Sequence, residues 1–341
     1  MKDAAAIDDF DECEETIDVQ KPCCDLEGLW LHSIKPLPVI EHAEILADGD
    51  IAASCWFGSV AVMRSGFVSL IGRPNVGKSS IINTICQRKV TIVSDKPQTT
   101  RTRIRAVLHR TDSQIVFVDT PGIHKPVSEL GKRVNSTATE TIRDVDINAL
   151  VIDATMPFGK GDRFISGQLN MQKSIVIVNK VDVASRERTM KQLAAVAELD
   201  AMAYFPVSAR TGDGVAMLTD WLASHLPAGE AMYPPDMVSE TPDTIWVAEL
   251  VREQLLVRMR EELPYSIATR VTEYEWPRIR CEIVVERESQ KGMVIGKGGQ
   301  LLKDVGTAVR LQLEPGAFLE LQVVVDDNWQ QRVDRIERLG Y

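Results

Sequence analysis

The chain has 341 residues, a formal net charge of −10 and a hydrophobic content of 44%. This apolar content is sufficient for more than one buried core and excludes a globally disordered chain. The acidic residues gather in the first part of the chain, so the net charge does not exclude a nucleic-acid partner for the remainder.

Residues 1–62 show no sustained hydrophobic period, and we expect a poorly ordered or non-native extension there. Its acidic start lacks the basic region of a signal peptide. The longest apolar run, at 51–63, is shorter than the ~18 residues of a membrane span. Because Met63 directly precedes the first clear strand, we expect it to be the true start of translation. The six cysteines form no CxxC pair and have no His at zinc-ligand spacing, which indicates a reduced cytosolic protein.

Strand and helix patterns alternate from about residue 66 to 226. The apolar, partly β-branched runs separated by helical patterns predict a mostly parallel sheet covered on both faces. An additional run at 104–110 precedes a polar turn and predicts an antiparallel edge strand paired with the next run. The five parallel runs are at 67–71, 114–119, 147–153, 174–179 and 203–208.

A Pro-rich polar stretch at 226–243 predicts an interdomain linker. The elements after it follow the order αββααβα: a helix over 243–262, strands over 266–276 and 278–287, two helical segments around GKGG that end near 313, a strand over 318–325 and a helix over 328–338. We therefore predict an α/β fold with a mostly parallel sheet followed by a smaller α+β domain. The expected boundaries are an extension 1–62, a first domain 63–230, a linker 231–243 and a second domain 244–341.

The sequence GRPNVGKS at 72–79 fits the P-loop pattern and lies between a strand and a helix, which is the context that supports the match. Gly72 and Gly77 let the backbone wrap phosphates, and the helix N-terminus attracts the anion. Lys78 is expected to reach the β- and γ-phosphates, and Ser79 to bind Mg²⁺. The remaining loop residues expected to bind nucleotide are Arg73, Pro74, Asn75 and Val76.

The sequence DTPG at 119–122 ends an apolar strand, as a Walker-B segment does. We expect Asp119 to hold Mg²⁺ through water and Gly122 to offer its N–H to the γ-phosphate. Thr120, Pro121 and Ile123 are expected to adjoin the nucleotide. Ile123 occupies the position where Ras-like proteins orient water with Gln, so we expect slow intrinsic hydrolysis.

The polar stretch 93–103, here called the switch loop, contains TTR at 99–101. We favour Thr100 over Thr99 as a magnesium ligand that orders this loop when a γ-phosphate is present. Lys78, Thr100 and Gly122 are thus the candidate catalytic groups. The alternative is a solvated basic loop whose arginines, among them Arg101, face RNA or solvent.

The sequence NKVD at 179–182 ends a strand and predicts selection of guanine. Asp182 can accept hydrogen bonds from N1–H and the exocyclic amine of guanine, whereas adenine lacks donors in that arrangement. We expect Asn179 to bind the base edge and brace the P-loop, and the stem of Lys180 to cover the purine. The other predicted contacts are Val181 and the backbone of Ser208 and Ala209. NKVD disfavours a P-loop ATPase.

The sequence VIGKGG contains a GxxG loop, Gly296, Lys297, Gly298 and Gly299, between two helical segments. Such a loop lets a nucleic-acid backbone approach closely, and the surrounding αββααβ order is that of a type II KH domain. Lys291, Lys297 and Lys303 flank the loop and are expected to meet the phosphates of single-stranded RNA.

The combination of GRPNVGKS, PQTTR, DTPG, NKVD, ELPYS (262–266), VERESQKGMVIGKGG (285–299) and the ERLGY tail resembles the Era family of GTPases over residues 66–341. The resemblance implies a Mg²⁺-dependent GTPase, cycling between GTP and GDP, that binds the 3′ end of 16S rRNA and the 30S ribosomal subunit during assembly and rRNA maturation. It also implies a cytoplasmic protein, expected to be a monomer, that associates peripherally with the bacterial inner membrane. Residues 1–62 have no counterpart in the family pattern.

Two functional alternatives stay open. One is a GTP-regulated RNA-binding or chaperone protein in which turnover contributes little. The other is a related GTPase acting in large-subunit or tRNA maturation, which the single set of nucleotide motifs and the RNA-binding pattern disfavour.

Overall fold

The computed structural model describes residues 63–341, apart from 124–127 and 260–262. The described residues all belong to one compact unit, Ser59–Tyr341. The predictions made for residues 1–62 lie outside the described part of the chain. None of the described helices is long and apolar enough to cross a membrane.

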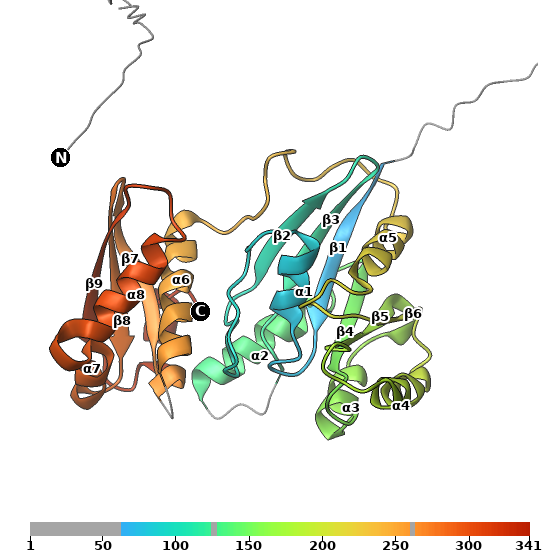
Figure 1. The fold of residues 1–341 in the computed structure, drawn as a ribbon, viewed down its shortest axis with the longest axis horizontal. Coiled ribbons are helices and arrows are strands. Elements are labelled where there is room, and N and C mark those ends of the chain that lie inside the picture. The colour runs from blue at the N-terminus through green and yellow to red at the C-terminus, as the bar shows by residue number, and fades with distance from the viewer. Residues whose placement is uncertain (1–62, 124–127, 260–262) are drawn as a thin grey trace, which may run out of the picture. The chain divides into compact units, whose positions relative to one another are not determined.

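The first sheet has six strands in the order β2-β3-β1-β4-β5-β6 (Figure 1). Neighbouring strands run parallel except for β2, which pairs antiparallel with β3 at the edge. The predicted mostly parallel sheet and its antiparallel edge strand are therefore confirmed. The strands are β1 (Arg64–Ile71), β2 (Ile104–His109), β3 (Ser113–Asp119), β4 (Ile147–Asp153), β5 (Ser174–Asn179) and β6 (Ala203–Pro206).

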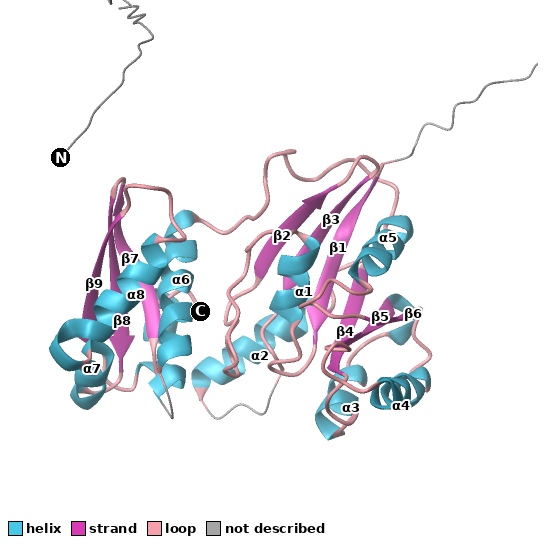
Figure 2. Ribbon diagram, in the orientation of Figure 1, coloured by secondary structure: helices cyan, strands magenta, loops and turns pink. Residues whose placement is uncertain are grey.

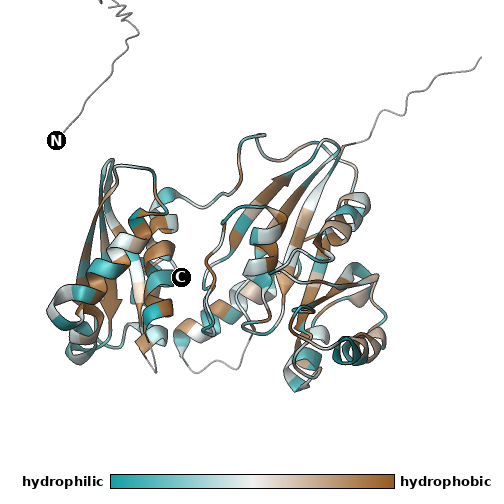
Figure 3. Cartoon of the chain, viewed as in Figure 1, coloured by the Kyte–Doolittle hydropathy of each residue, from teal (hydrophilic) through white to brown (hydrophobic). Residues whose placement is uncertain are grey.

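Helices cover both faces of this sheet, and apolar residues follow the strands almost without interruption (Figure 3). Successive side chains of a strand point to opposite faces. Val151 of β4 accordingly joins the core beneath α1 and α5, while its neighbours Leu150 and Ile152 join the core beneath α2, α3 and α4. Two buried faces explain why these strands read as continuous apolar runs. The helices are α1 (Lys78–Ile85), α2 (Glu129–Thr141), α3 (Lys160–Ser166), α4 (Arg186–Ala197) and α5 (Val215–His225), with a short 3-10 turn η1 (Met171–Lys173).

The second sheet has three strands in the order β7-β8-β9 (Figure 2). β7 and β8 are antiparallel, whereas β8 and β9 are parallel. Apolar residues of α6 and α8 form a core with this sheet. The elements are α6 (Asp243–Arg258), β7 (Ala268–Glu275), β8 (Arg278–Val285), α7 (Glu288–Ile295), α8 (Gln300–Arg310), β9 (Phe318–Val325) and α9 (Val333–Arg338), with 3-10 turns η2 (Leu263–Tyr265), η3 (Lys297–Gly299) and η4 (Trp329–Gln331). The predicted order αββααβα is confirmed.

The closing helix is shorter than predicted. The chain over 328–338 forms η4 and then α9, separated by Arg332 with extended backbone angles. The buried side chain of Trp329 donates from Nε1 to the carbonyl of Ser266 at 3.0 Å. This anchor holds η4 against the sheet, and α9 begins separately after it.

The stretch between the two sheets does not run free over its whole length. Val107 of β2 donates its N–H to the carbonyl of Val238 at 2.8 Å, and Glu240 donates back to Arg105 at 3.3 Å. The linker thereby forms an isolated antiparallel bridge, Ala106 to Ser239, along the outer edge of β2.

Candidate functional site

The loop 72–77 connects β1 to α1 and requires glycine at both ends. Gly77 has φ +96°, and a Cβ there would lie 2.2 Å from Nδ2 of Asn179. A Cβ on Gly72 would lie 2.4 Å from the carbonyl oxygen of Val151. Only glycine fits such close approaches, so the backbone path predicted from the motif is sterically enforced.

Lys78 begins α1 and its side chain is buried beneath the loop. Its Nζ donates to the carbonyls of Gly72 at 3.3 Å and Arg73 at 3.1 Å. Burial lowers the pKa of Lys78 to about 8, and the carboxylate of Asp119 opposes that effect. An ammonium group held only by carbonyls gains from an incoming anion, which fits the predicted contact with phosphate.

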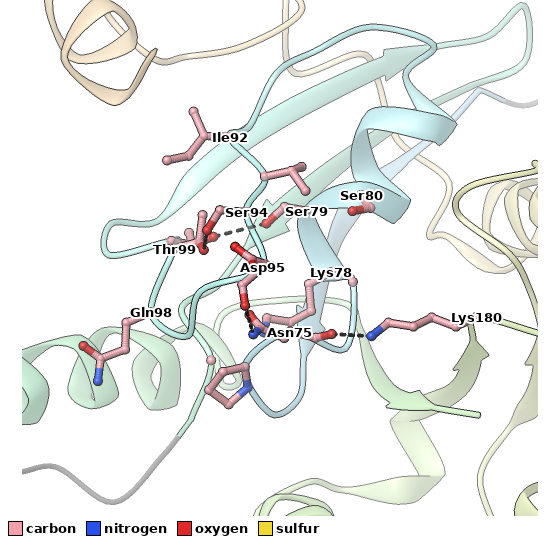
Figure 4. Close-up of a pocket in the computed structure, with 15 residues that line it drawn as sticks. Asn75, Lys78, Ser79, Ser80, Ile92, Ser94, Asp95, Gln98, Thr99 and Lys180 are labelled. Atoms are coloured by element: carbon pink, nitrogen blue, oxygen red, sulfur yellow. Dashed lines mark hydrogen bonds between the residues drawn. The ribbon is translucent and has the colours of Figure 1, made fainter. Parts of the chain in front are cut away.

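A cavity of about 470 Å³ opens beside this lysine (Figure 4). Predicted site residues from four segments line it, and so do switch-loop residues such as Gln98 that the motifs did not single out. The predicted residues at the cavity are Pro74, Asn75, Gly77, Lys78, Ser79, Thr100, Gly122 and Lys180.

Three oxygen-bearing side chains meet at the floor of this region. Ser79 Oγ lies 2.7 Å from Asp119 Oδ2 and 3.1 Å from Thr100 Oγ1. Thr100 Oγ1 is itself 3.2 Å from Asp119 Oδ2. Thr99 Oγ1 instead contacts Ser94 Oγ and the carbonyl of Lys96. Of the two threonines, Thr100 thus faces the predicted metal ligands.

Asp119 is fully buried, and its Oδ1 has no hydrogen-bond partner. Burial raises the pKa of this carboxyl, while the Lys78 ammonium and the hydroxyls of Ser79 and Thr100 counteract it. A buried carboxylate oxygen without a partner is costly unless a cation or donor reaches it. Carboxylate and hydroxyl oxygens are ligands that suit Mg²⁺, so these residues fit that ion.

The segment NKVD continues from β5 and braces its surroundings. Asn179 donates from Nδ2 to the carbonyl of Val76 at 2.9 Å and accepts the N–H of Ala209 at 3.0 Å. Asn179 therefore ties the P-loop to the loop that follows β6. These two hydrogen bonds are the geometry that the predicted bracing role requires. The contact of Asn179 with a base stays a prediction.

Lys180 reaches across the mouth of the P-loop, as Figure 4 shows. Its Nζ donates to the carbonyl of Asn75 at 2.7 Å and to Asp153 Oδ2 at 2.6 Å. Burial opposes ionisation of Asp153, but hydrogen bonds from Lys180 and Thr155 outweigh it and hold the pKa of that carboxyl below its usual value. Asp153 ends β4 and orients Lys180, a role that its position at a strand end could have suggested.

Asp182 lies outside the phosphate cavity, near the loop after β6. Its Oδ1 accepts a hydrogen bond from Ser208 Oγ at 2.7 Å. Its Oδ2 is buried without a hydrogen bond, although Nε of the exposed Arg210 approaches to 3.1 Å. The approach is short but lacks hydrogen-bond geometry, so Oδ2 remains an acceptor without a donor. A carboxylate oxygen without a donor can accept a hydrogen bond from a group such as the amine or N1–H of guanine.

Other predicted contacts are turned into the fold. Ile123 is buried in the core beneath α2 and α3. Thr120 Oγ1 donates to the carbonyl of Leu70 at 2.6 Å. Arg73 pairs with the buried Asp162 of α3, at 2.8 Å. Pro121, Val76 and Val181 do not line the cavity either. The side chains of Ile123, Thr120 and Arg73 thus contact the protein itself.

The view of the switch loop as a solvated basic segment is wrong for Arg101, which is 3% exposed. Its Nη1 donates to the carbonyl of Ile267 at 2.6 Å, and its Nη2 to that of Tyr265 at 3.1 Å. The guanidinium also lies over the rings of Trp329 and Tyr341. All four partners lie more than 160 residues further along the chain. Arg103, two residues away, is exposed.

The GxxG loop spans η3 between α7 and α8. Gly296, Gly298 and Gly299 have φ values of +74°, +60° and +78°. A Cβ on Gly296 would lie 2.8 Å from Cβ of Leu301, whereas the other two glycines face open space. Lys297 is exposed here, as is Lys303 on α8. The backbone is therefore open to a ligand at the tip of the loop.

Lys291 is less available than the other two predicted lysines. It lies on α7, is half-buried and pairs with Glu288 at 3.6 Å. Lys297 and Lys303 are consequently the stronger candidates for contacts with phosphates.

A P-loop with a buried lysine, oxygen-bearing side chains that meet beneath it and an NKVD strand end together define the first domain as a P-loop nucleotide-binding domain. The α6-β7-β8-α7-α8-β9 order with a GxxG turn defines the second as a KH module. Family models agree with both: "50S ribosome-binding GTPase" matches residues 67–180, and "KH domain" matches residues 262–330.

The chain belongs to the Era family of GTPases. It is 45% identical to GTPase Era of Mycobacterium tuberculosis over 297 residues, covering 82% of this chain and 99% of that protein. It is 44% identical to GTPase Era of a Mycobacterium species over 296 residues, with the same coverage.

Two solved Era structures have the same fold as this chain. One is Era in complex with MgGDPNP and nucleotides 1506–1542 of 16S ribosomal RNA. The other is a variant of Aquifex aeolicus Era bound to GDP·AlF4⁻. Each is 33% identical, has a TM-score of 0.78 and covers 82% of this chain and 99% of its own.

Proposed function

We propose that this GTPase binds GTP and GDP with Mg²⁺, hydrolyses GTP slowly, and binds the 3′ end of 16S rRNA on the 30S subunit during its assembly and rRNA maturation. The convergence of Ser79, Thr100 and Asp119 beside the buried Lys78 carries the nucleotide part of this proposal. The solved relative with a bound 16S rRNA segment, together with the open GxxG loop, supports the RNA part.

In the proposed site, Lys78 binds the β- and γ-phosphates, and the loop 72–79 surrounds them with backbone N–H groups. The bound Mg²⁺ would neutralise phosphate charge, held by Ser79 and Thr100 directly and by Asp119 through water. Gly122 offers its N–H to the γ-phosphate, and a Cβ there would lie 2.8 Å from the backbone of Pro74. Asp182 reads the guanine edge, with the backbone of Ser208 and Ala209 at the guanine oxygen.

Slow hydrolysis follows from the residue after DTPG. The side chain of Ile123 is buried in the core and carries no group that could orient water. Water must then be positioned by backbone groups, by Mg²⁺ or by a bound partner. A GTP-regulated RNA-binding protein in which turnover contributes little is the second candidate, and this same residue favours it. Single-turnover hydrolysis with and without 30S subunits separates the two, because a strong acceleration supports the enzymatic cycle.

For the RNA-binding loop we propose Gly296, Lys297, Gly298, Gly299 and Lys303 as the principal contacts, with Lys291 at the margin. The proposed domains are 63–230 and 244–341, joined by the linker 231–243. Family membership is the support for a monomeric, cytoplasmic protein with peripheral contact to the bacterial inner membrane. Cell fractionation tests the location, and light scattering tests the oligomeric state.

The decisive experiment measures binding of an RNA with the sequence of the 16S 3′ end, with a scrambled RNA as control. The native protein is compared with Lys78→Ala in GDP and in a non-hydrolysable GTP analogue. We expect preference for the 3′-end RNA in the native protein and loss of tight GTP binding in the variant. Equal affinity for both RNAs would contradict the RNA assignment, and retained micromolar GTP affinity in Lys78→Ala would contradict the P-loop assignment.

A further inference from the structure

The switch loop is held at two points by helix α6 of the KH module. Near its start, the N–H of Val93 donates to Oε1 of Glu253 at 2.9 Å, and Lys89 pairs with the same carboxylate. Near its end, the carbonyl of Thr99 accepts a hydrogen bond from Nη2 of Arg252. The segment between Val93 and Thr99 is thus held at both ends by one helix.

Thr99 immediately precedes the threonine that faces Ser79 and Asp119. The peptide unit between Thr99 and Thr100 therefore has the KH module on one side and the predicted metal ligands on the other. A shift of the Thr99 carbonyl away from Arg252 would also move Thr100. The side chain of Arg252 is therefore linked through a single peptide unit to Thr100, the candidate magnesium ligand.

On the other side of Thr100, the next residue, Arg101, is also held by the KH module. Its guanidinium is buried against the carbonyls of Tyr265 and Ile267 and the rings of Trp329 and Tyr341. Its Nε has no hydrogen-bond partner. A buried cation is stable only in the environment that compensates its desolvation. Arg101 thus keeps the loop docked only while the KH module surrounds it.

Arg252 is prearranged for its contact. It is 1% exposed and forms a buried ion pair with Glu249 one helical turn earlier, through Nε and Nη2. The pair fixes the planar guanidinium so that Nη2 meets the Thr99 carbonyl. A charge-assisted hydrogen bond from a fixed donor is strong and directional, which is what positioning a backbone carbonyl requires.

We propose that Arg252 and Arg101 are positioning residues for the GTPase site: through them the KH module holds Thr100 in the place where a triphosphate and Mg²⁺ need it. This proposal rests on the proposed role of Thr100 as a magnesium ligand. GDP lacks the γ-phosphate that recruits Thr100, so the contacts favour GTP over GDP. Because such coupling is reciprocal, GTP in turn stabilises the docking of the switch loop on the KH module.

The test uses the full chain and the double variant Arg252→Met/Glu249→Gln, which removes the hydrogen bond to Thr99 without leaving a buried unpaired carboxylate. The control is Arg270→Met/Glu282→Gln, which removes another, more exposed Arg–Glu pair of the same module, between strands β7 and β8. Fluorescent GDP and a fluorescent non-hydrolysable GTP analogue are titrated at several Mg²⁺ concentrations. Circular dichroism confirms that each variant is folded.

We expect the switch variant to lose about tenfold in affinity for the GTP analogue, to need more Mg²⁺ for that binding, and to bind GDP within twofold of the native protein. The control should leave both affinities unchanged. Equal loss for GDP and the GTP analogue, or no loss for either, would overturn the proposal.

If the double variant does not fold, the same titrations are made with Arg101→Met, a variant of the switch loop itself. Its control is Arg103→Met, which changes an exposed arginine of the same loop. The same selective loss is expected for Arg101→Met alone.

Thr100→Val separates this proposal from the function on which it rests. If Thr100→Val does not weaken binding of the GTP analogue more than binding of GDP, the assignment of Thr100 itself is wrong. If Thr100→Val shows this selective loss but the variants of Arg252 and Arg101 do not, the assignment of Thr100 holds and positioning by the KH module is refuted.

Discussion

Replacing Gly77 by Ala tests the steric argument for the P-loop. The residue has φ +96°, where a non-glycine residue costs about 1–2 kcal/mol. Its new Cβ would lie 2.2 Å from Nδ2 of Asn179 and must displace that side chain. Asn179 would then lose hydrogen bonds to Val76 and Ala209, worth about 0.5–1.5 kcal/mol each. We expect a total loss of about 2–5 kcal/mol in the free energy of unfolding, together with weaker nucleotide binding.

The matched control is Gly316→Ala in the KH module. Gly316 has nearly the same φ, +99°, but a Cβ there would meet nothing within 4 Å. Only the backbone cost of about 1–2 kcal/mol should remain. Urea titrations of both nucleotide-free variants, with GDP affinities from fluorescence, provide the comparison. The reasoning is refuted if Gly77→Ala is no more destabilising than Gly316→Ala and binds GDP like the native protein.

Three further predictions follow from the site. Burial lowers the pKa of Lys78 from 10.5 to about 8, so between these pH values the unfolded chain binds more protons than the folded protein. The free energy of unfolding of the nucleotide-free protein should therefore rise with pH across that window. Urea titrations at several pH values should show this rise, and Lys78→Met should remove it. Asp182→Asn should lower the preference for GTP over ATP at least tenfold in competition with fluorescent GTP, and an unchanged preference would exclude Asp182 from base recognition. Lys297→Glu with Lys303→Glu should weaken RNA binding about tenfold and reduce its salt dependence while GTP affinity stays unchanged; loss of both activities would indicate misfolding instead.

The strands of the first domain were predictable because two buried faces demand continuous apolar residues. The run 147–153 coincides with β4, and 174–179 coincides with β5. The final helix was not predictable, because the break at Arg332 depends on where Trp329 is anchored. That anchor is a contact with Ser266, some 60 residues earlier, which no local pattern contains.

In the candidate site, too, features set by local sequence were predictable and features set by distant contacts were not. Motif spacing placed Ser79, Thr100 and Asp119 in one site because short motifs encode local backbone geometry at strand ends. The polar neighbours of Arg101 in the sequence suggest solvent exposure, whereas its side chain is buried. Its burial depends on carbonyls and rings supplied by a distant module. Local polarity does not reveal which loop residue another module will cover.

The bridge between the linker and β2 has a consequence for how the KH module meets the switch loop. Glu240 is hydrogen-bonded to Arg105, and α6 begins only three residues later, at Asp243. The part of the linker between the β2 bridge and α6 is therefore far shorter than the Pro-rich stretch suggests. A short tether keeps the effective concentration of one module at the other high, so a few contacts suffice for docking. Inserting flexible residues between Glu240 and Asp243 would lower the effective concentration of α6 at the switch loop. It would alter none of the residues that form the contact.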